Sequence, residues 1–402
     1  MAEKRKIIND PVYGFITISN DLIFDVIAHP FYQRLRRIHQ MALAYLVYPG
    51  AVHTRLHHSL GAYHLMCLAV NELRNKGTLI TEEEEIAVKA AILLHDVGHG
   101  PFSHALENKF VVGIHHETLS LQIMKMMNED LNDKLNLAIE IFTNTYHRKF
   151  LHQLISGQLD VDRMDYLTRD SFFTGVSEGV IGYDRILKML VVHHDELMVE
   201  EKGIYSIEKF LIARRQMYWQ VYLHKTVMSA EVLLGIILKR VKELASEGVT
   251  DLRTGGATDF FLYDFDGIMN KATLQKFGEL DDIDFSFAIK KWSHHADFVL
   301  SQLCKRILNR QLLKIKLQSE PFDLSEIDEK LHHASVQLGV NKQIASYFVS
   351  TGTANNTMYQ SQDERINILF KDGTIKDIAA IDNSLIHQTI SAPIKKFYIC
   401  SL

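Results

Sequence analysis

The chain has 402 residues, of which 47% are hydrophobic and 23% charged, so it can bury a large core and form two or three units. Its net charge of −5 argues against a protein whose main task is to coat nucleic acid, because such proteins usually carry a basic surplus. The three cysteines form no CxxC pair, which argues against a thiolate zinc site or a disulfide framework and favours a reducing cytoplasm.

The first hundred residues predict one hairpin followed by three helices. The turn signal at Asn9 to Pro11 and the apolar alternation after Gly14 predict a short hairpin over residues 8–18. Apolar residues three or four apart predict a helix over residues 30–49, and another is expected over residues 57–77. Thr81 and the glutamates that follow it predict the start of a third helix, which ends near His95.

The rest of the chain is expected to be mostly helical and then to change character. No proline falls between Phe102 and Glu320, and helices are predicted around 117–130, 133–145, 148–156, 158–170, 183–191, 206–244 and 286–310. Two alternating runs around Lys371-Asp372-Gly373 predict a hairpin, and residues 395–402 a final strand. The charged N-terminus and the short apolar runs predict no signal peptide and no membrane span, since a span needs ~20 apolar residues.

The segment LLHDVGHGPFSH, residues 93–104, gathers three histidines and an aspartate. His95 and Asp96 follow an apolar helix, and imidazole with carboxylate suits Mn, Fe, Zn or Co, with Mg as an alternative. Further ligands must come from elsewhere, and the residues alone do not choose among the candidates, which are His53, His57, His58, His64, Asp160, Asp162, Asp165 and Asp170.

The segment QLDVDRMDYLTRD, residues 158–170, would place Asp162, Asp165, Tyr166 and Arg169 on one face of a helix. So many charges facing inward need a cation or a phosphate. The alternative is a surface helix with ion pairs along its own face.

The order of RLHH (55–58), HD (95–96) and a distant aspartate resembles the HD superfamily of metal-dependent phosphohydrolases. The additional motifs INDPVYG, QRLRRIHQ, YPGAVHTRLHHSLGAYHL, LLHDVGHGPFSH and LDVDRMDYLTRDSFFTG resemble its deoxynucleoside triphosphate (dNTP) triphosphohydrolase branch, which includes bacterial dGTPases. The resemblance implies a mainly α fold. An HD-domain helical bundle with the N-terminal hairpin is expected over residues 1–245, and a smaller α+β lobe containing a β-hairpin over residues 246–402.

The resemblance implies one divalent metal (Mn, Fe, Zn, Mg or Co) held by His58, His95, Asp96 and Asp162, and attack of metal-activated water on the α-phosphate. It further implies that His104 protonates the leaving oxygen, that His99 contacts phosphate and that His116 pairs with Glu107, which is one methylene longer than the usual aspartate. The residues that match phosphate and sugar contacts are Gln40, Arg55, Arg163, Tyr166, Asp170, Arg214 and Tyr222.

An animal member of the family binds activating nucleotides between subunits. The resemblance therefore implies a homo-oligomer, a dimer or a tetramer, and a regulatory nucleotide site here. The matching residues are Lys6, Ile7, Asn9, Gln33 and Arg36, whereas Ala28 replaces an aspartate that reads guanine, so guanine-specific activation is expected to be absent or altered. Two alternatives stay open: an HD phosphohydrolase acting on a monophosphate, cyclic nucleotide or alarmone, and a nucleotide-responsive regulator that binds nucleic acid.

Overall fold

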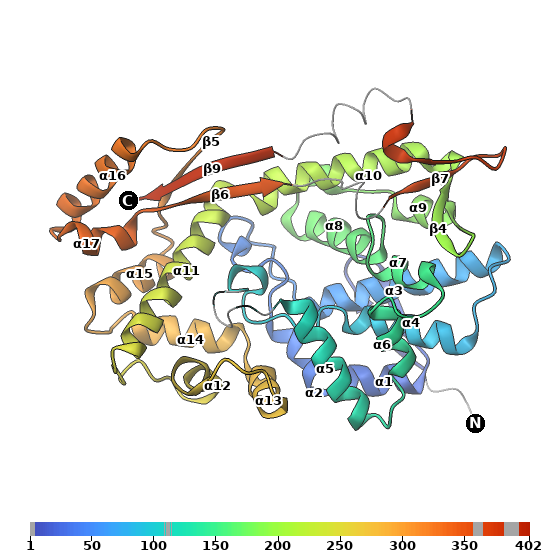
Figure 1. Ribbon diagram of the computed structural model, residues 1–402, viewed down its shortest axis with the longest axis horizontal. Coiled ribbons are helices and arrows are strands. Elements are labelled where there is room, and N and C mark those ends of the chain that lie inside the picture. Colours follow the sequence, from blue (N-terminus) through green and yellow to red (C-terminus); the bar gives the residue numbers. More distant parts are fainter. Residues whose placement is uncertain (1–4, 108, 110–112, 114, 357–364, 382–393) are drawn as a thin grey trace.

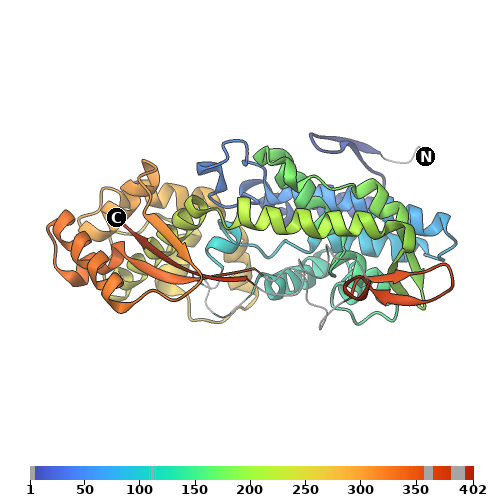
Figure 2. The same ribbon diagram turned by 90° about the horizontal axis from the view of Figure 1, so that it is seen from above.

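The structure, a computed structural model, describes residues 5–107, 109, 113, 115–356, 365–381 and 394–402. It is mainly α-helical with small sheets, as the sequence predicts, and two lobes lie at opposite ends of an elongated molecule (Figures 1 and 2). Helices α10 and α11 connect them.

The N-terminal lobe carries the residues of the predicted site. It starts with the hairpin of β1 (Lys6–Asp10) and β2 (Gly14–Ile18) and contains a second hairpin, β3 (Leu190–His193) and β4 (Glu196–Glu200). Its helices are α1 (Asp21–Ala28), α2 (Pro30–Arg34), α3 (Arg55–Asn75), α4 (Glu82–Leu94), α5 (His116–Asp130), α6 (Asn136–Phe142), α7 (Lys149–Ile155), α8 (Val161–Thr174), α9 (Tyr183–Met189), α10 (Ile204–Met217) and the first half of α11 (Lys225–Ser246).

The C-terminal lobe combines helices with a three-stranded sheet of order β5-β9-β6. Its elements are α12 (Gly256–Asp259), α13 (Lys271–Glu279), α14 (Asp282–Trp292), α15 (Phe298–Leu308), β5 (Lys314–Gln318), α16 (Leu324–Leu338), α17 (Lys342–Ala345), β6 (Ser350–Asn356) and β9 (Ile394–Ser401). Between β6 and β9 the chain crosses to the other lobe, where β7 (Asn367–Leu369) pairs in parallel with β4 and antiparallel with β8 (Ile375–Asp377).

Helices α3 and α8 approach closely because α3 has a glycine at the contact. A Cβ atom built on Gly61 would lie 2.0 Å from Asp165 Oδ1 and 2.1 Å from Arg169 Nη2. The buried pair of Asp165 and Arg169 occupies the space of the missing side chain, and Arg169 also donates to Asp10 of β1. The small residue therefore brings the α8 carboxylates within reach of the α3 histidines.

Several predicted elements are confirmed. The N-terminal hairpin, the hairpin at Gly373 and the final strand are present. Thr81 caps α4 through a capping box with Glu84. Glu84 is itself buried and accepts from Arg148 and Tyr146.

Other predictions were wrong in extent. The helix predicted over 30–49 is α2 alone, followed by short 3₁₀ turns, because His39 bridges to Thr54 and Ala42 has a positive φ. The helix predicted over 206–244 breaks after a π-helical turn at Tyr218–Tyr222, and that over 286–310 is α14 and α15, with Asp297 capping the second. The hairpin of β3 and β4 was not predicted, although His194 and Asp195 form its turn with positive φ.

Among the described residues, no single helix has both the length and the apolar character to cross a membrane. Residues 201–222 and α11 reach that length and composition only as a pair, which bends by 58° between its halves.

Candidate metal centre and active site

Three helices bring three ligand atoms to one point. His58 lies on α3, His95 directly follows α4, and Asp162 lies in the first turn of α8. His58 Nε2 is 3.3 Å from His95 Nε2 and 3.0 Å from Asp162 Oδ1, and His95 Nε2 is 3.5 Å from the same oxygen. Ligands at about 2.0–2.2 Å from one divalent ion are separated by about 3 Å, so this spacing fits a metal site.

The far nitrogens of both imidazoles determine which nitrogen faces the centre. His95 Nδ1 lies 2.6 Å from the carbonyl oxygen of Ile92, which can only accept, so Nδ1 carries the hydrogen. His58 Nδ1 lies 2.7 Å from Asp165 Oδ2, the carboxylate–histidine arrangement typical of metal sites. Each neutral ring therefore directs an Nε2 lone pair at the Asp162 carboxylate, and only a cation satisfies three such acceptors.

The pKa values show the same demand for positive charge. Burial would lower the pKa of His58, but Asp162 and Asp165 outweigh burial and raise it to about 10. Burial would also lower the pKa of His95, but Asp96 and Asp162 outweigh burial and raise it. Against the effect of burial, the two histidines hold the pKa of Asp162 well below its usual range. A centre of two nitrogens and a carboxylate in this state fits a divalent metal.

Asp96 lies at the edge of this cluster. Its Oδ1 is 3.5 Å from His95 Nε2 and its Oδ2 is 3.6 Å from His58 Nε2. The carboxylate also accepts from Arg55 and lies 3.3 Å from His99 Nε2. Burial would raise the pKa of Asp96, but Arg55, His95 and His99 hold it well below its usual range. The structure thus brings together three of the four predicted ligands and places the fourth beside them.

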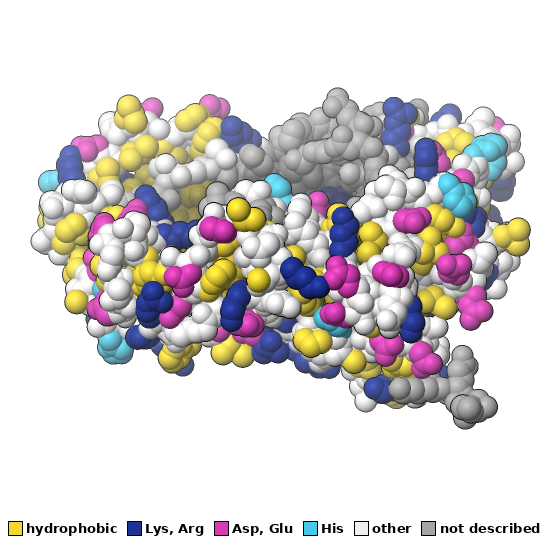
Figure 3. Space-filling view, turned by 60° about the horizontal axis from the view of Figure 1, so that its bottom comes forward, with side chains coloured by type: hydrophobic (Ala, Val, Ile, Leu, Met, Phe, Trp, Pro, Cys, Tyr) yellow, Lys and Arg dark blue, Asp and Glu magenta, His cyan; other side chains and the backbone are white. Residues whose placement is uncertain are grey.

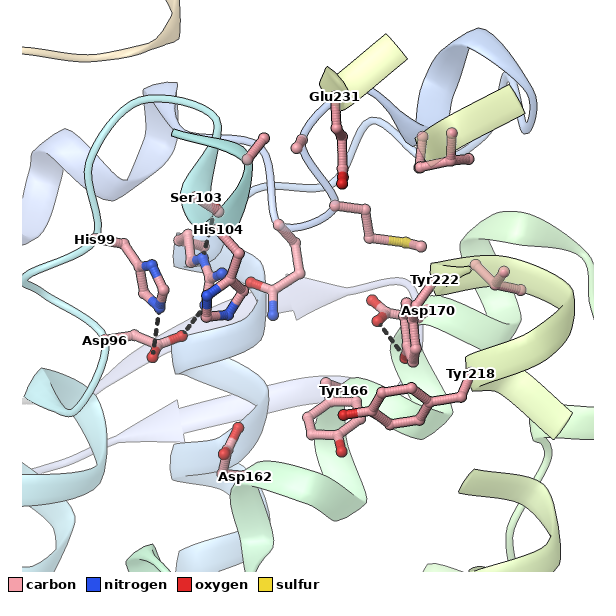
Figure 4. Close-up of a pocket in the computed structure, with 18 of the residues that line it drawn as sticks. Asp96, His99, Ser103, His104, Asp162, Tyr166, Asp170, Tyr218, Tyr222 and Glu231 are labelled. Atoms are coloured by element: carbon pink, nitrogen blue, oxygen red, sulfur yellow. Dashed lines mark hydrogen bonds and ion pairs between the residues drawn. The ribbon is translucent and has the colours of Figure 1, made fainter. Parts of the chain in front are cut away.

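A cavity of about 430 Å³ opens beside the centre, which is the size of small-molecule sites (Figure 4). Arg55, Arg163 and Arg214 line it, as do the other predicted phosphate and sugar contacts. Arg55 Nε donates to Ser103 Oγ at 3.0 Å, Arg163 pairs with Asp160, and Arg214 Nη1 donates to Gln158 at 3.2 Å. The Nε atoms of Arg163 and Arg214 are buried without a hydrogen-bond partner among the residues that the structure describes, so donors remain for an anion.

Asp170 and Tyr222 also line the cavity. Asp170 Oδ1 lies 2.7 Å from His53 Nε2, and Asp170 Oδ2 accepts from the Tyr222 hydroxyl at 2.7 Å. His53 is therefore an orienting partner of Asp170. Gln40 Oε1 is buried and has no donor in the described part of the chain, which leaves an acceptor for a ligand hydroxyl. The Tyr166 and Tyr222 rings meet edge to face, with centroids 6.2 Å apart.

His99, His104 and His116 form a second histidine cluster at the cavity wall. The rings of His99 and His116 stack with centroids 3.9 Å apart, and His104 meets both edge-on. Glu107 lies 2.7 Å from Nδ1 of both His104 and His116. Its carboxylate therefore joins His116, its predicted partner, to His104, the predicted proton donor. Burial would raise the pKa of Glu107, but these histidines hold it well below its usual range. Burial and Arg55 hold the pKa of His99 well below its usual range.

Comparison with known proteins places this geometry in a family. Residues 55–170 match the HD domain, and residues 181–260 match the HD associated region. The chain is 34% identical to the protein YwfO of Bacillus subtilis, over 96% of this chain and 90% of that protein. It is 51% identical to a phosphohydrolase from Bacteroides thetaiotaomicron, whose crystal structure superimposes with a TM-score of 0.95 over 99% of this chain and 100% of that one.

The chain belongs to the HD-domain phosphohydrolases. A more distant relative is the deoxynucleoside triphosphate triphosphohydrolase SAMHD1 homolog of Dictyostelium discoideum. It is 31% identical over 58% of this chain, which spans about half (48%) of that relative's length. This HD phosphohydrolase is therefore related to that protein over part of each chain, and the expected relation to the dNTP triphosphohydrolase branch is supported.

Sequence reasoning missed the residues that support the HD loop from outside. Arg34 is fully buried and donates to the carbonyl oxygens of Val97 (3.3 Å), His99 (2.6 Å) and Leu280 (2.9 Å). Asp282 of α14 accepts from Phe102 N at 2.6 Å. Both contacts join segments far apart in the chain, and the only local signal was the arginine run at 34–37.

The residues predicted for a regulatory nucleotide lie near the molecular surface. Arg36 donates to Gln33 at 2.7 Å, and Gln33 donates to the carbonyl oxygen of Ile27. Lys6 lies over the Phe24 ring, 5.3 Å from its centroid, and Asn9 is exposed on β1. These residues do not line the cavity of the HD site.

Proposed function

We propose that this HD phosphohydrolase hydrolyses dNTPs to a deoxynucleoside and tripolyphosphate. One observation carries the proposal: the His58, His95 and Asp162 cluster lies beside a cavity that is lined by three arginines and by groups that can bind a hydroxyl. Three guanidinium groups suit a triphosphate, and the side-chain oxygens of Gln40 and Asp170 suit a sugar hydroxyl.

Each predicted residue then has a role in the reaction. His58, His95, Asp96 and Asp162 would hold a divalent metal, which would supply the Lewis acidity that activates water for attack on the α-phosphorus. The residues that bind the phosphates are Arg55, Arg163, Tyr166, Arg214 and His99. Gln40, Asp170 and Tyr222 orient the deoxyribose, and the Tyr222 ring leaves no room for a 2′-hydroxyl.

His104 is the proposed general acid. Its side chain is 65% exposed toward solvent and cavity, so it can reload with a proton after each turnover. Glu107 accepts from Nδ1 and stabilises the protonated ring, which leaves the Nε2 hydrogen free for the leaving 5′-oxygen. His116, stacked on His99, holds the other oxygen of Glu107.

The products distinguish this reaction from the alternatives. Purified protein is incubated with each dNTP and Mn²⁺, and the products are separated by anion exchange. Tripolyphosphate with deoxynucleoside is expected. His95→Ala should abolish turnover, whereas the control His64→Asn, whose ring stacks on Tyr13 outside the cluster, should keep it. Orthophosphate, pyrophosphate or no turnover would contradict the proposal and favour another phosphohydrolase or a regulator.

We also propose the division at residue 245, a homo-oligomer, and a regulatory nucleotide bound by Lys6, Asn9, Gln33 and Arg36. Nucleic acid is the less favoured partner. On the face shown in Figure 3, basic and acidic side chains alternate, and positive charge does not gather into one patch. Sedimentation with and without each nucleotide measures the number of subunits.

A further inference from the structure

One carboxylate in the cavity has no role in the reaction described above. Asp96, Asp162, Asp170 and Glu231 line the cavity. The first three are held by Arg55, His58 and Tyr222 respectively. Glu231 has neither an ion pair nor a hydrogen bond with any residue in the described part of the chain.

Glu231 is half-buried and lines the cavity together with apolar residues. It projects from α11 into the cavity, away from Asp162, Tyr166 and Tyr218 on the far side (Figure 4). The lining around it includes Met41, Ala44 and Val227. Burial raises its pKa to about 7, against the attraction of Lys109. A half-buried carboxyl group without a partner among the described residues points to a ligand that supplies the missing donors.

Lys109 does not supply those donors. Its ammonium group donates to the carbonyl oxygen of Ala105 at 2.8 Å and packs near Gly235, one turn further along α11. No ion pair within 4.0 Å joins it to Glu231 in the described structure. A structural salt bridge is therefore not the role of this glutamate.

We propose that Glu231 binds the nucleobase and makes the enzyme prefer guanine. This inference rests on the proposed binding of a nucleotide in the cavity. With phosphates at the arginines and deoxyribose at Gln40 and Asp170, the remaining apolar slot beside Met41 receives the base. Met41 follows Gln40 directly in the chain, so the base slot adjoins the sugar site.

The donor pattern of the bases explains the choice of guanine. A carboxylate offers two adjacent acceptors, and only guanine presents two adjacent donors, N1–H and the N2 amino group, on its pairing edge. Adenine and cytosine each offer one donor beside an acceptor, and thymine offers a donor between two acceptors. An acceptor that faces another acceptor in a buried slot is strongly disfavoured.

Binding of the free deoxynucleosides tests this assignment without catalysis. Titration calorimetry measures deoxyguanosine, deoxyadenosine and thymidine against wild type, Glu231→Gln, Glu231→Asp and the control Glu247→Gln, an exposed glutamate at the end of the same helix. Wild type and the control should bind deoxyguanosine about tenfold or more tightly than the other two. Glu231→Gln should lose that preference and gain affinity for deoxyadenosine, because its amide offers one donor beside one acceptor. Glu231→Asp should lose part of it.

An unchanged preference in Glu231→Gln, or equal affinities in wild type, would overturn the assignment. Folding of each variant is checked by its thermal unfolding midpoint. The two proposals fail separately. Release of tripolyphosphate with no base preference removes only the role of Glu231. A guanine preference that depends on Glu231, without release of tripolyphosphate, removes the proposed reaction and keeps the base site.

Discussion

Replacement of Asp282 by alanine should both destabilise the protein and misplace the catalytic loop. The Asp282 side chain is 4% exposed and accepts from three donors: His39 N at 2.8 Å, His39 Nδ1 at 2.6 Å and Phe102 N at 2.6 Å. Alanine leaves two backbone N–H groups unpaired, each at about 1–3 kcal/mol, so the free energy of unfolding should fall by about 2–6 kcal/mol.

The loop that Asp282 supports is strained. Phe102 and Ser103 have φ values of 54° and 50°, a conformation that costs a non-glycine residue about 1–2 kcal/mol. Once the Phe102 bond is lost, relaxation of these residues should displace His104, so kcat should fall by about tenfold or more.

Urea unfolding and steady-state kinetics measure both effects. Asp282→Asn keeps one acceptor oxygen and should lose about half as much stability. The control Glu279→Ala removes a carboxylate that contacts only Lys276 at the surface, and its stability should change by less than about 0.5 kcal/mol. If Asp282→Ala unfolds within about 1 kcal/mol of wild type, the second lobe does not support the loop as described.

Three further predictions concern the α3–α8 contact and the cavity. Gly61→Ala should destabilise by about 1–3 kcal/mol in urea unfolding despite its better helix propensity, because its Cβ meets a buried ion pair. Gly235→Ala should instead stabilise slightly, since the atoms nearest to its Cβ belong to the flexible end of Lys109. If both variants changed the free energy of unfolding equally, the close packing of α3 on α8 at Gly61 would be contradicted. Asp165→Asn should weaken metal binding by about 10–100-fold in equilibrium dialysis, because it orients His58; unchanged affinity would show that this bond has no such role. The fold favours the uncharged form of Glu231, whose pKa is about 7 in the folded protein and 4.5 ordinarily. Its contribution to the free energy of unfolding is therefore fully present below pH 4.5 and is lost as the pH rises through 7. Glu231→Gln should therefore gain stability over wild type between pH 5 and 8, by at most about 3 kcal/mol, whereas a pH-independent difference would mean that Glu231 is not held in an apolar slot.

The convergence of the metal centre was predictable in part. The HD pair after an apolar helix indicated a cation, because imidazole and carboxylate at a helix end need one, but the residues alone did not select His58 or Asp162. The resemblance selected them, and the structure places His58 within 3.6 Å of the other three predicted ligands and Asp162 within 3.5 Å of both histidines. Asp165 was left among the candidate ligands, because a sequence does not show that Arg169 and His58 neutralise it.

Contacts across long stretches of chain explain most of what could not be predicted. The pattern of residues 30–49 is helical, yet Arg37 pairs with Asp281 and His39 with Asp282, more than 240 residues away. These bonds, with the bridge from His39 to Thr54, stabilise an irregular backbone after α2, although the local sequence favours a helix there. The break in the helix predicted over 206–244 had no proline signal, and it turns Tyr218 and Tyr222 into the cavity.

The strand order of the C-terminal lobe constrains how the chain can acquire its shape during synthesis. Strand β9 occupies the middle of its sheet, although it follows both neighbours in the chain. Until residues 394–401 leave the ribosome, β5 and β6 have no common partner and their inner edges stay unpaired. This sheet therefore cannot be completed before its last strand has been synthesised, and a chaperone that shields open strand edges would act on it during that interval.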